Sequence, residues 1–526
     1  MAAVLESPAP AADAGAIAWL RRVRGSSRLA LMLHLSTRVL TSLMALVWTR
    51  LLLRTMGKPL NGLFLSFQNA AQLGGVGDLG MGGAISIQVG QQMARGEEEE
   101  LQKFLAVART IFLGLALTMG CGFVTLMPWL AEPMGFKPVA GSGPLFPLFA
   151  VGSISVAGLV FLSYANNLNY GCGTVTWPII PTAVILQFTL FSHWLLARHH
   201  CPLWMQYCPY AAGLIMNVLL AWIYLRASFV SLARILPMRF NFRMALTLFE
   251  RSFWMYLCVL GNLVYVNTSS LVIQAKFGSA QVPLYRYNYR VCELAVFMIL
   301  SASFVAVPKL TTWLADPSPE ARARVLPNLR RMNQFQTLAG CMGALVYLSI
   351  NDLFMTYWLG ADMRAPLLWQ AGFALNLAVT TSGDACIQAA SRCGTNGIRV
   401  TGSVIGFTAI VNVVLSITAA KLGHMGGIAL AAGVAQSILS LGLSLYVCRY
   451  LKTSWMPWVL RGWLLPTATV AAATALRMSI PLDTAAHALM LTGCFVALAA
   501  AVGLMLGINR TFIREELAML RTFLPK

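Results

Sequence analysis

Long apolar stretches recur along nearly the whole chain, and they limit its fold more than any other feature. A helix that crosses a membrane needs about 20 mostly apolar residues, and about fourteen stretches of this chain provide that length. They lie near 29–53, 60–89, 104–127, 145–169, 177–197, 207–227, 252–275, 282–308, 333–358, 366–391, 398–420, 426–448, 455–476 and 485–508. Only 11% of the residues are charged, which is too few to cover soluble domains in water. We therefore expect an all-α polytopic membrane protein.

Basic residues are distributed unevenly between the two sides of this predicted bundle. Most of the 38 Lys and Arg residues fall in alternate connections, and the connections on the other side are short. Because basic loops stay in the cytoplasm, the bias predicts that the N- and C-termini are both cytoplasmic. The net charge of +20 then reflects orientation in the membrane, and we expect no nucleic acid among the partners.

The two halves of the chain resemble each other at one constant shift. Gly57 falls on Gly278 at a shift of 221 residues, and the run GCGT at 171–174 falls on RCGT at 392–395. A shift of six spans preserves orientation in the membrane. The sequence therefore predicts two six-helix lobes related by a parallel repeat, with a central cleft between them and two C-terminal helices outside the repeat.

The spans and the repeat divide the chain into segments. We expect a cytoplasmic N-terminal segment at 1–28, an N-lobe of spans 1–6 at 29–227, a cytoplasmic amphipathic linker at 228–251, a C-lobe of spans 7–12 at 252–451, spans 13 and 14 at 455–508, and a cytoplasmic tail at 509–526. The linker and the tail mix basic and apolar residues, a pattern typical of helices that lie on anionic lipid. Membrane lipids are therefore expected partners.

Two regions carry a family resemblance. The stretch TRLLLRTMGKPLNGLFLSFQNAAQLGGVGDLGMGG resembles the start of Wzx-type polysaccharide flippases, in the multidrug/oligosaccharidyl-lipid/polysaccharide exporter superfamily. The matching residues are Arg50, Gly57, Gly62, Phe64, Asp78, Leu79 and Gly80. The run LVIQAKFGSAQVPLYRYNYRVCEL is similar to the family's junction of spans 7 and 8, with Tyr285 at the usual Tyr position. The family often has an acidic residue in span 7, where this chain has Asn262 and Asn267.

The resemblance implies a function in surface polysaccharide synthesis. A member of this family is a flippase of the bacterial inner membrane, which moves an undecaprenyl-diphosphate-linked oligosaccharide from the cytoplasmic to the periplasmic leaflet by alternating access. The glycan would belong to O-antigen, capsule or exopolysaccharide, and glycan polymerases or glycosyltransferases are candidate partners. We expect an ion-coupled secondary transporter rather than an enzyme, with no cofactor, because the sequence lacks the phosphate-binding loop GxxxxGK[ST].

Other functions remain open at this stage. The first alternatives are a multidrug or cation antiporter and a lipid II flippase of the same superfamily. A membrane-embedded O-antigen ligase or polymerase is disfavoured because the outer loops are too short for a catalytic domain. The metal-capable residues His193, His199, His200, Cys201 and Cys208 fit no established ligand spacing, so we expect no metal site.

Charged residues inside the spans are the candidates for substrate binding, because each costs about 2.5–3.5 kcal/mol to insert. Arg38 lies near the middle of span 1, and Arg286 and Arg290 lie one helical turn apart in span 8. We expect these three arginines to bind a diphosphate and anionic sugars. Tyr285 and Tyr289 share the same face and are expected to contact sugar rings, although tyrosines are also typical of the membrane interface.

Three acidic residues inside the spans are candidates for ion or proton coupling. Asp78 lies among the glycines of span 2, Glu293 follows Arg290 by three residues in span 8, and Asp384 lies in span 10. The alternative is internal pairing, in which Glu293 neutralises Arg290 and Asp78 neutralises Arg38. The sequence does not decide between these two interpretations.

Overall fold

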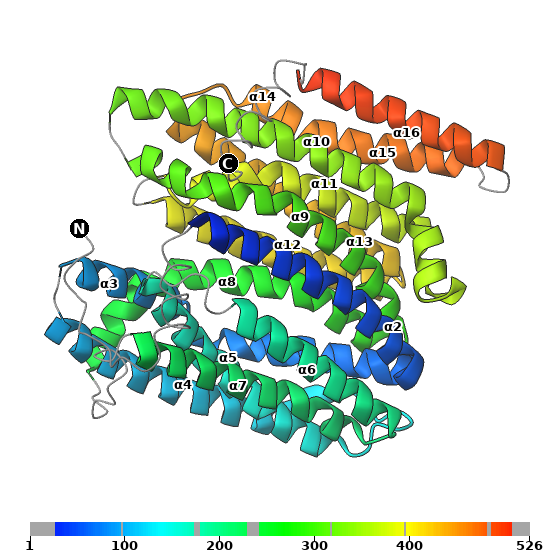
Figure 1. Ribbon diagram of the computed structural model, residues 1–526. Helices are drawn as coiled ribbons and strands as arrows, with labels where there is room; N and C mark the ends of the chain where they lie inside the picture. Colours follow the sequence, from blue (N-terminus) through cyan, green and yellow to red (C-terminus); the bar gives the residue numbers. More distant parts are fainter. Residues whose placement is uncertain are drawn as a thin grey trace.

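The computed structural model describes residues 27–95, 98–172, 179–228, 241–315, 318–393, 396–480 and 485–507. Over these residues the chain forms helices and no strands, and the helices run roughly parallel to one another (Figure 1). Nine of the described helices are long and apolar enough to cross a membrane, judged by length and composition. The expected all-α membrane class is confirmed.

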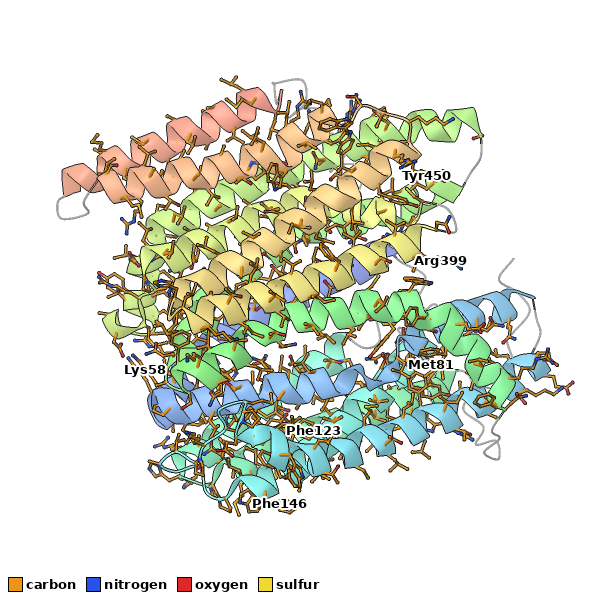
Figure 2. All side chains as sticks on the ribbon, turned by 180° about the vertical axis from the view of Figure 1, so that it is seen from behind. Lys58, Met81, Phe123, Phe146, Arg399 and Tyr450 are labelled. Atoms are coloured by element: carbon orange, nitrogen blue, oxygen red, sulfur yellow. The ribbon has the colours of Figure 1, made fainter. Side chains whose placement is uncertain are left out.

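The N-lobe contains the helices up to the middle of the chain. It consists of α2 (Ser27–Gly74), η2 (Gly75–Asp78), α3 (Met81–Arg95), α4 (Glu98–Ala131), α5 (Leu145–Gly171), α6 (Ile179–Arg198) and α7 (Leu203–Ser228). The backbone of α2 is not helical at Gly57, so α2 comprises the first span and the start of the second. Figure 2 places Lys58, next to this turn, at one end of the bundle.

The C-lobe repeats this arrangement. It consists of α8 (Phe242–Phe277), α9 (Gln281–Ala315), α10 (Pro319–Trp358), η3 (Ala361–Met363), α11 (Leu367–Ala390), α12 (Gly397–Lys421) and α13 (Met425–Tyr450). From α10 onward, these α-helices begin within a few residues of their N-lobe counterparts shifted by 221. Helices α2 and α8 lie between the two groups, where α2 contacts α8 and α9 (Figure 1).

The turn glycines confirm the repeat at the level of the backbone. Gly57 and Gly278, which the shift aligns, have φ angles of 71° and 87°. Glycine adopts positive φ without the steric penalty of a side chain, so it suits both turns. The predicted relation between the lobes is therefore present in the structure.

The second span is broken near its middle, which the sequence indicated only as a glycine-rich region. After α2 ends at Gly74, η2 supplies one 3-10 turn, and Leu79 and Gly80 both adopt positive φ before α3 begins. Such a break in a membrane helix frees backbone groups that need new partners. It also places Asp78 next to the N-terminus of α3.

The last two spans pack on the C-lobe. They are α14 (Met456–Val459), η4 (Leu460–Leu464, a π-helical turn) with α15 (Leu465–Ser479), and then α16 (Ala485–Met505). Helices α15 and α16 both contact α10, and α15 also contacts α11. Arg477 of α15 pairs with Asp352 of α10 at 2.8 Å, which joins this pair of helices to the lobe.

Some expectations fall outside the described residues. The N-terminal segment is described only from residue 27, the amphipathic linker lacks 229–240, and the tail begins beyond residue 507. The predicted segment boundaries and the cytoplasmic position of the termini therefore stay predictions. The arrangement of the spans does not depend on these segments.

Candidate functional site

The first part of α9 carries a compact charged group. The carboxylate of Glu293 lies 2.7 Å from Nη1 of Arg290 and 3.8 Å from Nη2 of Arg286. The helical spacing of these residues places them on one face, as the sequence predicted. Two guanidinium groups therefore share one carboxylate, which leaves the group with one unbalanced positive charge.

The charged group is accessible at one end and enclosed at the other. The side chain of Arg286 is 16% exposed, whereas that of Arg290 is 38% exposed. Arg290 lies in the first third of α9, and its exposed fraction leaves its side chain accessible to a further acceptor. Guanidinium groups favour bidentate contact with phosphate or carboxylate. Arg290 is therefore the better placed of the two to meet an incoming anion.

An aromatic wall flanks the charged group. The rings of Tyr285 and Tyr289 stack at 6.4 Å, and Phe373 of α11 meets both, at 5.0 Å and 5.6 Å. The guanidinium carbon of Arg286 lies 5.8 Å from the centre of the Tyr289 ring, which is a cation–π contact. Tyr285 is only 4% exposed and also contacts Trp369. Its ring therefore packs inside the aromatic wall and is not at the surface.

The opposite side of the same helical turns is fixed to its neighbours. The amide of Asn288 donates to the carbonyl oxygen of Met363 at 3.0 Å and accepts a hydrogen bond from Asn351 at 2.9 Å. Tyr287 points toward the N-lobe and donates to Asn61 at 2.5 Å. Buried polar groups of this kind hold a helix in one position because an unmade hydrogen bond is costly. The arginines and tyrosines of α9 therefore stand on a rigid support.

Asp78 is held at the break in the second span. Its carboxylate accepts hydrogen bonds from the hydroxyl of Ser163 in α5, at 2.6 Å, and from the backbone N–H of Gly80, at 3.0 Å. Asn167 donates to the same Ser163 hydroxyl at 3.3 Å. The positive end of a helix dipole stabilises a carboxylate, and α3 begins three residues after Asp78. Asp78 thus has a polar setting without a basic partner in the contacts described here.

Asp384 lies in a second polar setting inside the C-lobe. The residue is 5% exposed, and its carboxylate accepts from the amides of Gln336 at 2.9 Å and Gln388 at 3.1 Å. Asn333 of α10 donates to the carbonyl oxygen of Ser382 in the same region. These contacts join α10 to α11 and keep a buried carboxylate hydrogen-bonded.

The predicted site residues are thus partly brought together. Arg286, Arg290, Glu293, Tyr285 and Tyr289 form one group, and the internal pairing of Glu293 with Arg290 is present. Asp78 and Asp384 lie apart from this group, because their described partners belong to other helices. The side chain of Arg38 lies outside the described residues, so neither its substrate contact nor its pairing with Asp78 is tested.

The histidines divide between core and surface. His193 is fully buried, stacks on Phe64 at 4.3 Å and lies 3.3 Å from the hydroxyl of Tyr210. His199 and His200 are exposed beyond the end of α6. Within the described ranges no three His, Cys, Asp or Glu residues are grouped as metal ligands.

Sequence reasoning missed the partners that come from distant parts of the chain. Phe373, which completes the aromatic wall, is 88 residues from Tyr285, and Gln336 is 48 residues from Asp384. Both are uncharged residues in apolar spans, where many similar residues only pack helices. Nothing local marks them, and the repeat alignment does not pair them.

Comparisons with known proteins place the fold. The lipid II flippase MurJ in an inward closed conformation is 15% identical over 92% of this chain and 100% of its own, with a TM-score of 0.62. An inward-facing multidrug resistance MATE family transporter of the MOP superfamily is 13% identical over 81% of this chain and 99% of its own, with a TM-score of 0.60. An outward-facing transporter of that description is 12% identical over 82% and 98%, with a TM-score of 0.55.

These likenesses concern architecture. No family model matches the sequence, and no curated protein matches it. At identities of 12–15% a structural likeness shows the fold alone. The chain has the fold of these flippases and transporters. The Wzx-type assignment stays a prediction.

Proposed function

We propose that this protein is a flippase for a lipid-linked oligosaccharide, with an undecaprenyl-diphosphate carrier, in the synthesis of a surface polysaccharide. The observation that carries the proposal is the group on α9, in which Arg286 and Arg290 share Glu293 as their one acidic partner among the described residues, beside an aromatic wall. A diphosphate supplies the negative charge that this group lacks. Aromatic rings next to cations suit the sugars that follow the diphosphate.

Transport proceeds by alternating access of the two lobes. The head group binds near α9, between the lobes, while the polyprenyl chain stays in the lipid. The lobes then exchange contacts and expose the head group to the periplasmic leaflet. No covalent bond is made or broken, so the cargo must be elongated or transferred by separate glycan polymerases or glycosyltransferases in the same inner membrane.

The three carboxylates are the candidates for coupling transport to an ion or a proton. Glu293 already pairs with the arginines that would bind the diphosphate, so cargo and carboxylate compete for the same partners. A carboxylate that loses its arginines in a membrane gains stability from a proton or a cation. Asp78 and Asp384 have amide and hydroxyl partners instead of the α9 arginines, and they are the second candidates.

A lipid II flippase is the alternative that a specific observation favours. The first structure named above is described as a lipid II flippase, and its cargo is also lipid-linked. A multidrug or cation antiporter is less favoured, because the unbalanced charge on α9 is positive. The three functions separate by cargo: a lipid-linked oligosaccharide, lipid II or a cationic drug.

Complementation tests the proposal in cells. In a strain that lacks the gene, Arg290→Ala should abolish surface polysaccharide while the protein remains in the membrane at its normal level. Arg198→Ala is the matched control, because Arg198 lies at the end of α6 over the ring of Trp194 and away from α9. Undiminished polysaccharide in Arg290→Ala cells would remove Arg290 from the site. Loss in both variants would show that the effect is not specific to α9.

A further inference from the structure

The two lobes meet backbone to backbone at the end of the bundle that carries Lys58, which is the outer end in the predicted orientation. A Cβ atom on Gly62 of α2 would lie 1.7 Å from the carbonyl oxygen of Ser279, between α8 and α9. A Cβ atom on Gly135, whose φ is 73°, would lie 2.6 Å from the carbonyl oxygen of Gln274. No side chain fits in either place, so these glycines allow the lobes to close.

Buried hydrogen bonds cross the same contact. The hydroxyl of Tyr287 donates to the side-chain oxygen of Asn61 at 2.5 Å, and these residues are 6% and 1% exposed. The hydroxyl of Ser66 donates to Gln274 at 3.0 Å, and the Gln274 amide donates to the carbonyl oxygen of Gly135 at 2.7 Å. Each of these bonds joins an N-lobe residue to a C-lobe residue.

An exposed ion pair completes the closure at the surface. Nζ of Lys58, next to the turn in α2, lies 2.6 Å from the carboxylate of Asp362 in η3. The indole N–H of Trp358 donates to the carbonyl oxygen of Leu46 at 2.9 Å, again from one lobe to the other. The polar contacts therefore extend from the buried Tyr287 to the solvent.

Tyr287 and the candidate ligand residues share one helical segment. Tyr287 directly follows Arg286 and precedes Arg290 by three residues, so a single turn of α9 carries all three. Asn288 ties the same turn to α10 and to Met363, which makes it move as one body. A ligand that draws the backbone of this turn toward itself, together with its arginines, would move the Tyr287 hydroxyl away from Asn61.

We propose that the Tyr287–Asn61 hydrogen bond is the latch of an outer gate, and that an anion bound by Arg286 and Arg290 releases it. Tyr287 is a positioning residue: it contacts the opposite lobe, not the cargo. The coupling part rests on the proposed function, since it requires an anionic ligand at the arginines. The latch part stands on the contacts between the lobes alone.

Chemical crosslinking across the gate measures its closure. Lys58→Cys with Asp362→Cys places two thiols at the outer ion pair, and Cys121→Ser removes a native thiol that is exposed. A short bis-maleimide then joins the pair in the purified protein, and the rate reports the closed fraction. Tyr287→Phe should lower the ratio of closed to open protein about fivefold, the weight of one buried hydrogen bond, and the crosslinking rate should fall by up to that factor. Asn61→Ala should give a similar loss, and Gly62→Ala a larger one.

Matched controls separate the latch from general damage. Tyr357→Phe removes a hydroxyl from a side chain that is 76% exposed, and Gly122→Ala adds a methyl group where nothing lies within 4 Å. Both controls should crosslink at the parent rate. The latch is overturned if Tyr287→Phe and Asn61→Ala also crosslink at that rate.

A ligand arm tests the coupling. Inorganic pyrophosphate should slow crosslinking in the parent pair, and should have no effect when Arg290→Ala is added. An unchanged rate with pyrophosphate in the parent would overturn the coupling, even with the latch in place. If Arg290→Ala cells keep their polysaccharide while Tyr287→Phe still opens the gate, the proposed function fails and the latch remains.

Discussion

Neutralising Glu293 should tighten the binding of an anion to the arginines of α9. In this structure the carboxylate lies 2.7 Å from Arg290 and 3.8 Å from Arg286. Because these side chains are partly exposed, we use the dielectric constant of water, which gives about 1.5 and about 1.1 kcal/mol for the two attractions. An anion that binds both arginines in the parent protein must replace their attraction to Glu293. In Glu293→Gln this attraction is absent, so the anion binds without that cost.

The sum of the two attractions sets the size of the expected change in the Kd of the anion. About 2.6 kcal/mol corresponds to roughly an 80-fold change in Kd. The glutamine can still accept a hydrogen bond, so the expected gain lies between about 10-fold and this limit. Titration of the purified protein with inorganic pyrophosphate in a calorimeter measures it, with Glu132→Gln at an exposed position just after α4 as the control. Equal or weaker binding by Glu293→Gln would refute the competition between carboxylate and anion.

Three further predictions concern other contacts. Cells with Arg290→Lys should make more surface polysaccharide than cells with Arg290→Ala but less than the parent, since lysine cannot make a bidentate contact. Polysaccharide at the parent level in Arg290→Lys cells would indicate that Arg290 acts as a simple point charge. Arg477→Ala should lower the stability of the purified protein by about 1–3 kcal/mol, because it removes the cation that pairs with the Asp352 carboxylate and leaves it the hydrogen bond from Gln370; thermal unfolding checks this, and Arg477→Ala should cost little more once Asp352→Asn is present. Lys58 lowers the pKa of the Asp362 carboxyl through its hydrogen bond, so the ion pair is intact above the ordinary aspartate pKa and is lost only as the pH falls through the lowered value; gate closure, measured by hydrogen exchange of the backbone at 57–62 after correction for the intrinsic pH dependence of exchange, should therefore not change between about pH 6 and pH 8.

The architecture could be predicted because its signals are periodic and long. A span needs about 20 apolar residues whatever its neighbours are, so each predicted stretch coincides with a helix or pair of helices. The shift that aligns Gly57 with Gly278 rests on a backbone requirement, since both positions need positive φ. Constraints of this kind can be recognised in a single sequence.

The charged group was predictable for a related reason. Spacings of four and three residues within one helix determine which side chains share a face, so Arg286, Arg290 and Glu293 could be grouped without a fold. The contact of Tyr287 with Asn61 could not, because it depends on how two lobes meet across 226 residues of sequence. Tyr285, Tyr287 and Tyr289 look alike in the sequence, and only their neighbours separate the aromatic wall from the gate.

The break at Asp78 could be predicted only in part from the sequence. The sequence shows Asp78 among the glycines of span 2, but glycines permit both a bend and an interruption by a 3-10 turn. The hydrogen bond from Ser163 holds the Asp78 carboxylate at the break, and Ser163 lies 85 residues away on α5. The sequence therefore located this feature without giving its geometry.

The most direct test of the central claim is a flipping assay with the purified protein in liposomes. An undecaprenyl diphosphate carrying a fluorescent oligosaccharide is placed in both leaflets, and a membrane-impermeant reagent destroys the glycan in the outer leaflet. We expect that the protein lets the reagent reach the protected half, that Arg290→Ala does not, and that Arg198→Ala does. Liposomes whose protected half survives equally with and without the protein would contradict the claim that it is a flippase for this cargo.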